Sequence, residues 1–175
     1  MLGPTAGFGQ KRTVRTVSTK LQEKMLMKQE FVLDPINGVG PVRLGASREA
    51  VIAALGTPTA SFHKTPNSRH PVDAWFGNGF QVFYEGDQPM VAFIELSEGH
   101  DFEAVLFGLP VFTTTTAILV REVGHRAKHD EADPELGCSY IFPSLELALW
   151  RPDSDDNEAP YFSTVGIGGA GYFSA

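Results

Sequence analysis

Residues 42–58 read Val-Arg-Leu-Gly-Ala-Ser-Arg-Glu-Ala-Val-Ile-Ala-Ala-Leu-Gly-Thr-Pro, and this stretch decides the fold. Ser47 is a good N-cap, because its side-chain oxygen can accept a hydrogen bond from a free backbone N–H of the first helical turn. Gly56 and Pro58 stop a helix in the usual order, since glycine adopts the left-handed conformation and proline follows beyond it. Apolar residues at helical spacing lie between these signals: Ala50, Val51, Ala54 and Leu55. The stretch predicts a short helix with one buried face.

Strand-like segments follow this helix after a polar loop over residues 57–71. They are rich in aromatic and β-branched residues and are separated by glycine-containing turns: Trp75–Phe76, Phe80–Tyr84 and Met90–Leu96. In the last segment we expect Val91, Phe93 and Glu95 to share one face, because side chains alternate along a strand. The pattern predicts an antiparallel β-meander behind the helix.

The second half of the chain has the same order. A run of possible caps over residues 113–116 precedes an apolar helical segment that ends at Gly124. A polar loop follows, and then three more strand-like segments: Ser139–Phe142, Leu145–Trp150 and Tyr161–Ile167. We therefore expect an α+β fold of two degenerate copies of a helix followed by an antiparallel β-meander, sharing a core or a sheet.

The expected division of the chain has three parts. Residues 1–30 are a basic N-terminal tail or short helix, with Ser18 as a candidate cap. Residues 31–98 are the first copy and residues 99–175 the second. Neither copy is long enough to bury its apolar face well alone, so residues 31–175 should form one compact unit.

The helix signature in residues 42–58 resembles a repeat that occurs in the beta-lactamase inhibitor protein family and in the small lipoprotein of the outer-membrane assembly machinery. In that repeat a helix of the form Gly, small, Ser/Thr … Val … Leu-Gly-x-Pro precedes a β-meander. The resemblance implies a concave sheet that binds another protein. The lipobox, signal peptide and disulfide pair of those proteins have no counterpart here, so secretion and their targets are not implied. In its general character the sequence also resembles immunity proteins of bacterial toxin systems.

The net charge of the 175 residues is −7, and it is unevenly spread. Residues 1–28 hold 6 Lys or Arg and 1 Glu, whereas residues 29–175 hold 8 Lys or Arg and 20 Asp or Glu. Such an acidic body repels nucleic-acid backbones and anionic membranes and attracts basic protein surfaces. We expect a basic protein partner, no nucleic acid and no membrane; a homo-oligomer stays open.

Apolar runs are short and interrupted by charges or proline, well below the ~20 residues that a membrane-spanning helix needs. The N-terminus lacks the apolar core of a secretory signal. Cys138 is the only cysteine, which excludes a disulfide framework and a Cys-rich zinc site. These features predict a cytoplasmic protein with a reduced thiol.

Two acidic segments are the candidate partner-binding sites. Their carboxylates are Asp130, Glu131, Asp133 and Glu135 in one segment, and Asp153, Asp155, Asp156 and Glu158 in the other. If the two loops cluster, they would steer a basic partner toward the protein; the alternative, that they only confer solubility, stays open. They favour a non-enzymatic protein-binding module, an immunity or inhibitor protein that neutralises a basic toxin or enzyme.

Two alternatives belong to other functional classes. A metal-dependent hydrolase would use the His125–Asp133 loop: His125 and His129 have a spacing that suits a zinc site on a helix, with Asp133 nearby. Gly124 ends the preceding helix, so we expect a solvated loop and no metal or other cofactor. A self-associating structural protein would instead bind the tail, residues 1–28, to the acidic body of another copy.

Acyl transfer would need a nucleophile beside a His–Asp pair. Ser61, Ser68 and Cys138 are available, and Asp73 lies near His70 in the sequence. None of the three nucleophiles lies on a recognisable nucleophile elbow, so we do not expect a catalytic site there.

Overall fold

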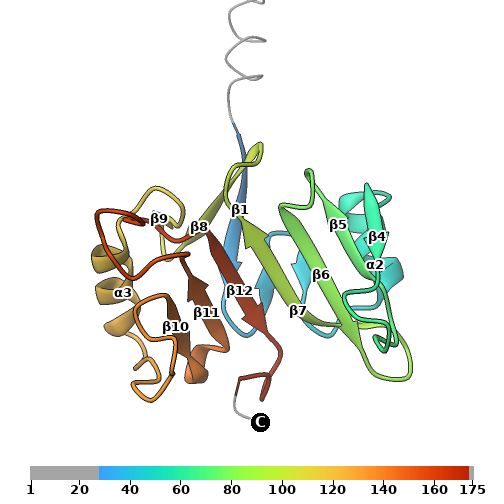
Figure 1. The fold of residues 1–175 in the computed structure, drawn as a ribbon. Coiled ribbons are helices and arrows are strands. Elements are labelled where there is room, and N and C mark those ends of the chain that lie inside the picture. The colour runs from blue at the N-terminus through green and yellow to red at the C-terminus, as the bar shows by residue number, and fades with distance from the viewer. Residues whose placement is uncertain (1–27, 174–175) are drawn as a thin grey trace, which may run out of the picture.

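The computed structural model describes residues 28–173, and the expected tail helix capped by Ser18 lies outside them. The described chain is α+β and mostly β, with two helices and two sheets (Figure 1). The helices are α2 (Arg48–Leu55) and α3 (Thr116–Gly124). The strands of the first half are β1 (Gln29–Asp34), β2 (Gly38–Val39), β3 (Val42–Arg43), β4 (Ala60–Phe62), β5 (Val72–Trp75), β6 (Phe80–Glu85) and β7 (Met90–Ser97). Those of the second half are β8 (Phe102–Leu106), β9 (Leu109–Pro110), β10 (Ser139–Phe142), β11 (Leu147–Trp150) and β12 (Thr164–Gly168).

Seven strands form an antiparallel large sheet in the order β10-β11-β12-β7-β6-β5-β4. The pairing of β12 with β7 joins the two halves of the chain. A small sheet has the order β3-β2-β1-β8-β9, in which β1 and β8 run parallel and again come from different halves. Each half therefore contributes strands to both sheets.

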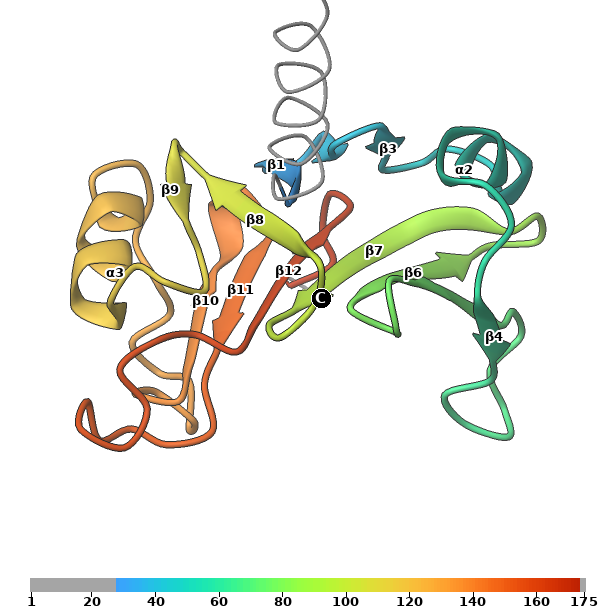
Figure 2. The same cartoon turned by 90° about the horizontal axis from the view of Figure 1, so that it is seen from above.

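The small sheet and both helices lie on one face of the large sheet, as the view from above shows (Figure 2). One cluster of buried side chains from both halves fills the space between them; its largest fully buried members include Phe31, Phe80, Phe142, Phe162, Ile94 and Leu119. In the described part of the chain, the opposite face of the large sheet carries only loops and the C-terminal segment (Figures 1 and 2). We call it the open face; its side chains include Phe83, Phe93, Glu95 and Trp150.

Helix α2 begins and ends where the sequence predicts. The Ser47 hydroxyl accepts a hydrogen bond from the Ala50 N–H at 3.3 Å, and Gly56 has a φ of +83°. The predicted apolar stripe is only half right: Val51 is buried and Leu55 half-buried, but Ala50 and Ala54 are exposed. This short helix lies along one end of the large sheet, so only a narrow strip of it reaches the core.

The two helices are attached to the large sheet in the same way. The Arg48 N–H donates to the Pro89 carbonyl at 3.0 Å, directly before β7, and the Thr116 N–H donates to the Pro160 carbonyl at 2.9 Å, shortly before β12. In each case the N-cap residue also forms an isolated bridge to the residue after that proline. The start of each helix is thereby held beside the beginning of the last strand of its half for α2, and beside the segment that leads into that strand for α3.

Several strands differ from the sequence predictions. The loop expected over residues 57–71 contains the edge strand β4, and β8 lies in a segment for which no strand was predicted. Strand β11 begins at Leu147 rather than Leu145, because residues 143–145 form a 3-10 turn and Glu146 follows with a φ of +47°. Strand β12 begins at Thr164 rather than Tyr161.

A β-bulge corrects the expected face of β7. Phe83 pairs with Phe93, but the next residue, Tyr84, pairs with Val91, so Ala92 is an extra residue in the ladder. Because the bulge shifts the alternation by one residue, Val91 joins the core, while Phe93 and Glu95 lie on the open face.

Candidate functional site

The two predicted acidic segments lie on neighbouring loops. Residues 130–135 belong to the connection between α3 and β10, and residues 153–158 belong to the connection between β11 and β12. The loops approach each other at Gly137 and Ser154, where a Cβ atom built on Gly137 would lie 3.1 Å from the Ser154 Cβ. The structure thus brings the two connections together at one end of the large sheet.

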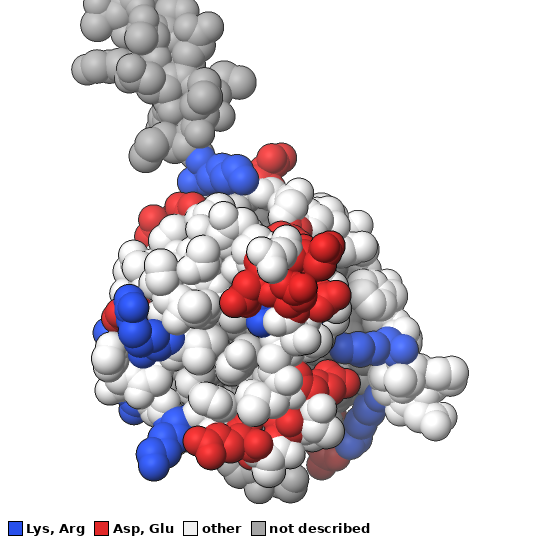
Figure 3. All heavy atoms as spheres, turned by 60° about the vertical axis from the view of Figure 1, so that its left-hand side comes forward, with Lys and Arg blue, Asp and Glu red and all other residues white. Residues whose placement is uncertain are grey.

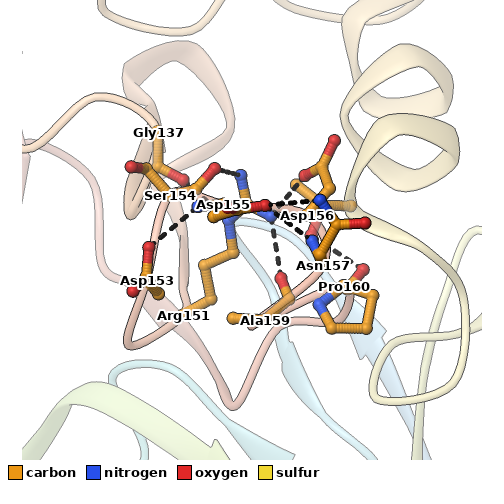
Figure 4. A network of polar contacts seen from close by, with 10 residues as sticks. Gly137, Arg151, Asp153, Ser154, Asp155, Asp156, Asn157, Ala159 and Pro160 are labelled. Carbon is orange, nitrogen blue, oxygen red and sulfur yellow. Dashed lines mark hydrogen bonds and ion pairs between the residues drawn. The ribbon is translucent and has the colours of Figure 1, made fainter.

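Arg151 joins these loops, and the sequence analysis did not single it out. Its side chain is only 3% exposed. Nε donates to the Gly137 carbonyl at 2.7 Å, and Nη2 donates to the Ser154 carbonyl at 2.8 Å. Nη1 donates to the Asp156 carboxylate at 2.6 Å and to the Ala159 carbonyl at 2.8 Å (Figure 4). One buried guanidinium therefore ties the 153–158 loop to its own ends and to the neighbouring loop.

A signal for this role is present in the sequence. Arg151 is the only Lys or Arg between residues 139 and 175, and it directly precedes the acidic loop. A lone cation beside many carboxylates is a candidate for an internal ion pair, and arginine suits several carbonyl and carboxylate acceptors at once. Gly137, however, is not a sequence neighbour of Arg151, so this contact could not be read from the sequence.

The carboxylates of the 153–158 loop differ in how they are used. Asp153 accepts from the Asp155 N–H at 2.9 Å, and Asp155 accepts from the Asn157 N–H at 2.8 Å (Figure 4). Asp156 pairs with Arg151 although its side chain is 70% exposed. The loop is thus held by its own hydrogen bonds, and its four acidic residues, Glu158 included, remain exposed.

The 130–135 loop has a similar local pattern. Asp130 accepts from the Ala132 N–H and Asp133 from the Glu135 N–H, each at 2.9 Å. The second oxygen of Asp133 is buried without a hydrogen-bond partner. Glu131 and Glu135 are exposed. Figure 3, turned toward the α3 side of the molecule, shows acidic side chains gathered around a small basic area.

Large apolar side chains are exposed at both ends of the 153–158 loop. Trp150, three residues before it, is 42% exposed, and Tyr161, three residues after it, is 41% exposed. Leu136, in the neighbouring connection, is 41% exposed. Trp and Tyr are enriched among the residues that dominate binding energy at protein interfaces.

The residues of the metal alternative do not form a ligand set. His125 is the exposed C-cap of α3. The His129 ring packs edge-on against Tyr140 and Phe142, with centroids 5.5 and 5.9 Å apart. Within residues 28–173, no group of three or more His, Cys, Asp or Glu side chains is placed to hold a metal ion.

Ser61 and Asp73 do come together, but with an arginine instead of a histidine. Asp73 is fully buried; it accepts from Ser61 Oγ at 2.8 Å and from Arg48 Nε and Nη2 at 2.7 and 2.8 Å. Burial acts to raise the pKa of Asp73, but the bonds from Arg48 and Ser61 outweigh it and hold the pKa below its ordinary value. Burial and the nearby Asp73 charge raise the pKa of Tyr84.

The histidine that a Ser–His–Asp arrangement needs does not accompany Ser61 and Asp73 in the described part of the chain. His70 contacts the Gly86 carbonyl and His63 the Ser68 carbonyl, and in the described residues no histidine bonds to Ser61 or Asp73. Cys138 is half-buried, and its carbonyl accepts from the Arg151 N–H. The cluster around Asp73 anchors α2 to β4 and β5.

Comparisons with protein-family models, with curated protein sequences and with solved structures found no match for this chain. Among the described residues, no helix has both the length and the apolar character needed to cross a membrane.

Proposed function

We propose that this protein is a non-enzymatic binding module that neutralises a basic partner protein, as an immunity or inhibitor protein does. The observation that carries the proposal is the bracing of the 153–158 loop by buried Arg151, with three bonds to backbone carbonyls and one to Asp156. A loop that is already ordered loses less conformational entropy on binding than a flexible one.

The surroundings of the loop also support binding to a basic protein. Exposed carboxylates at 153, 155 and 158 would steer a cationic surface toward the site and make association sensitive to salt. Trp150 and Tyr161 would supply apolar anchors beside them. The 130–135 loop, linked to this one through Gly137, would extend the acidic surface.

We further propose that residues 31–98 and 99–175 are two degenerate copies of one unit. The first half has three strands before its helix and the second half has two, and in each half the helix is followed by a run of antiparallel strands. The matching attachments of Arg48 to Pro89 and of Thr116 to Pro160 support this proposal.

The single, unpaired Cys138 agrees with a reducing compartment, and we propose the cytoplasm.

The test is capture of partners from a lysate of the source organism at low and high salt, with mass spectrometry of the retained proteins. The loop variant D153N/D155N/E158Q removes three exposed charges and keeps Arg151 and Asp156. The control variant E98Q/D101N/E103Q changes the net charge equally, at three exposed residues in and near the β7–β8 turn. Both variants should unfold at the same temperature as the wild type.

We expect a basic protein that the wild type and the control retain at low salt, and that high salt releases. The loop variant should lose it. Equal capture by the loop variant and the control, or capture that does not change with salt, would contradict the proposal.

A further inference from the structure

Glu95 lies in the middle of the open face. It is in β7, opposite Gly166 of β12 on one side and Gln81 of β6 on the other. The side chain is half-buried. In the described residues it has no hydrogen bond or salt bridge, unlike the fully buried Asp73 and Arg151.

A group of aromatic rings lies next to Glu95 on the open face. Phe93, two residues away on the same face, packs edge-on against Phe83 with centroids 5.5 Å apart. Tyr172 of the C-terminal segment stacks on Phe93 at 4.7 Å. Glu146 holds that segment in place, because its carboxylate accepts from the Gly171 N–H at 2.6 Å and the Phe173 N–H at 2.9 Å.

The residues in line with Glu95 on β12 and β11 carry little or no side chain, whereas Gln81 lies on its β6 side. Gly166 has no side chain, and a Cβ atom there would overlap the Phe93 ring, so this ring lies across Gly166. Ala148 follows in the same row of the sheet. Trp150 pairs with Thr164, which pairs with Ser97, so its exposed indole lies on the same face as Glu95, one row along and two strands away.

One cation of this chain already lies over an aromatic ring of the open face. The Lys64 ammonium lies 4.8 Å from the centroid of the Phe83 ring. Aromatic faces attract ammonium and guanidinium groups, and a half-buried carboxylate favours the same ligands. A divalent metal ion is a poorer fit, since it needs several carboxylate, imidazole or carbonyl ligands and Glu95 is a single carboxylate.

We propose that the open face around Glu95 receives a lysine or arginine side chain of the basic partner protein. This inference rests on the proposed function and extends it from the acidic loop to the sheet. The cation would pair with Glu95 while its aliphatic stem lies against Phe93 and the exposed face of Trp150. Glu95, which has no hydrogen bond or ion pair among the described residues, gains an ion pair on binding.

The electrostatics of the free protein support this assignment. Burial raises the pKa of Glu95, and the Lys64 charge offsets only part of that effect. The ionised carboxylate therefore costs stability in the free protein. Residues that serve binding often carry such a cost.

The experiment uses full-length protein labelled with ¹⁵N and titrated with an acetylated, amidated hexalysine peptide at low salt. Amide chemical shifts report where the peptide binds, and Trp150 fluorescence reports affinity, because Trp75 is 3% exposed and lies in the core. E95Q is the test variant. E103Q is the matched control, since it removes an exposed carboxylate from β8 in the small sheet. D153N/D155N tests the acidic loop separately.

We expect peptide-induced shifts at residues 93–95 and 164–168, and an affinity about fivefold to tenfold weaker for E95Q than for E103Q. E95Q should also melt at a higher temperature than the wild type. Weaker binding combined with higher stability would not result from a merely structural role of Glu95.

Equal affinity for E95Q and E103Q, or shifts confined to the loops, would overturn the inference. If D153N/D155N still weakened binding in that case, the proposed function would stand without the Glu95 contact. If neither variant differed from E103Q, both proposals would fail.

Discussion

Replacing Arg151 with methionine tests whether one side chain holds the acidic loop. Methionine keeps most of the aliphatic volume of arginine but donates no hydrogen bond. The variant loses bonds to the carbonyls of Gly137, Ser154 and Ala159 and to the Asp156 carboxylate. We expect the 153–158 loop to lose its order and the protein to lose stability.

The magnitude follows from the environment of each bond. A hydrogen bond from a charged donor contributes about 1.5–3 kcal/mol. The Asp156 share is discounted to below about 1 kcal/mol, because that side chain is 70% exposed and water replaces its partner. Water also reaches part of the freed backbone, so the total loss should be about 3–5 kcal/mol. For a chain of this length that lowers Tm by about 10 °C.

Urea unfolding followed by circular dichroism measures the loss, and hydrogen exchange of the amides of residues 153–158 locates it. R121M is the matched control, since the Arg121 side chain is 64% exposed and its only ion pair within residues 28–173 is with the adjacent Glu122 at 3.5 Å. That control should change the free energy of unfolding by less than about 0.5 kcal/mol. If R151M unfolds within about 1 kcal/mol of the wild type and keeps its loop amides protected, the bracing argument is wrong.

Two further predictions concern the other half of the chain and the centre of the large sheet. D73N should destabilise the protein at neutral pH and flatten the pH dependence of its unfolding free energy in acid. The wild-type Asp73 has a pKa below its ordinary value, so its contribution to stability is present above about pH 4 and is lost as the pH falls through the lowered folded-state pKa. Urea titrations between pH 2 and 7 would show this difference. G166A should lower the free energy of unfolding by about 1–3 kcal/mol, because the added methyl group overlaps the Phe93 ring, on which Tyr172 stacks. The control G124A has open space around the added methyl group and should leave the free energy of unfolding unchanged or raise it. Equal effects of the two substitutions would contradict this packing.

The parts of the fold that were predictable from the sequence depend on local signals. Ser47 and Gly56 define α2 because capping involves residues within one turn of the chain. Strand β8 was missed because four of its five residues are buried and no alternation marks it. Its pairing with β1 joins residues about seventy positions apart, which no local pattern reports.

In the candidate site too, features that depend on local sequence were predictable and features that depend on distant segments were not. The carboxylates at 130–135 and 153–158 were visible as composition, and the structure places them on neighbouring loops. Arg151 was missed because its acceptors at Gly137 and Ala159 come from separate segments. Glu95 was expected to share a face with Phe93, which is correct, but the bulge at Ala92 moved Val91 from that face to the core.

The hydrogen bonds of the buried charged residues distinguish those that stabilise the fold from the one proposed to bind a partner. Arg151 has four side-chain hydrogen bonds, Asp73 has bonds from Arg48 and Ser61, and Glu146 has two backbone N–H groups. Each is therefore compensated within the chain, and its loss should destabilise the fold. Among the described residues Glu95 has no hydrogen bond or ion pair, and the Lys64 charge offsets only part of the cost of its burial, so folding alone gives little reason for a carboxylate at that position. An external cation supplies one, and the opposite effects of E95Q on stability and on binding would follow from it.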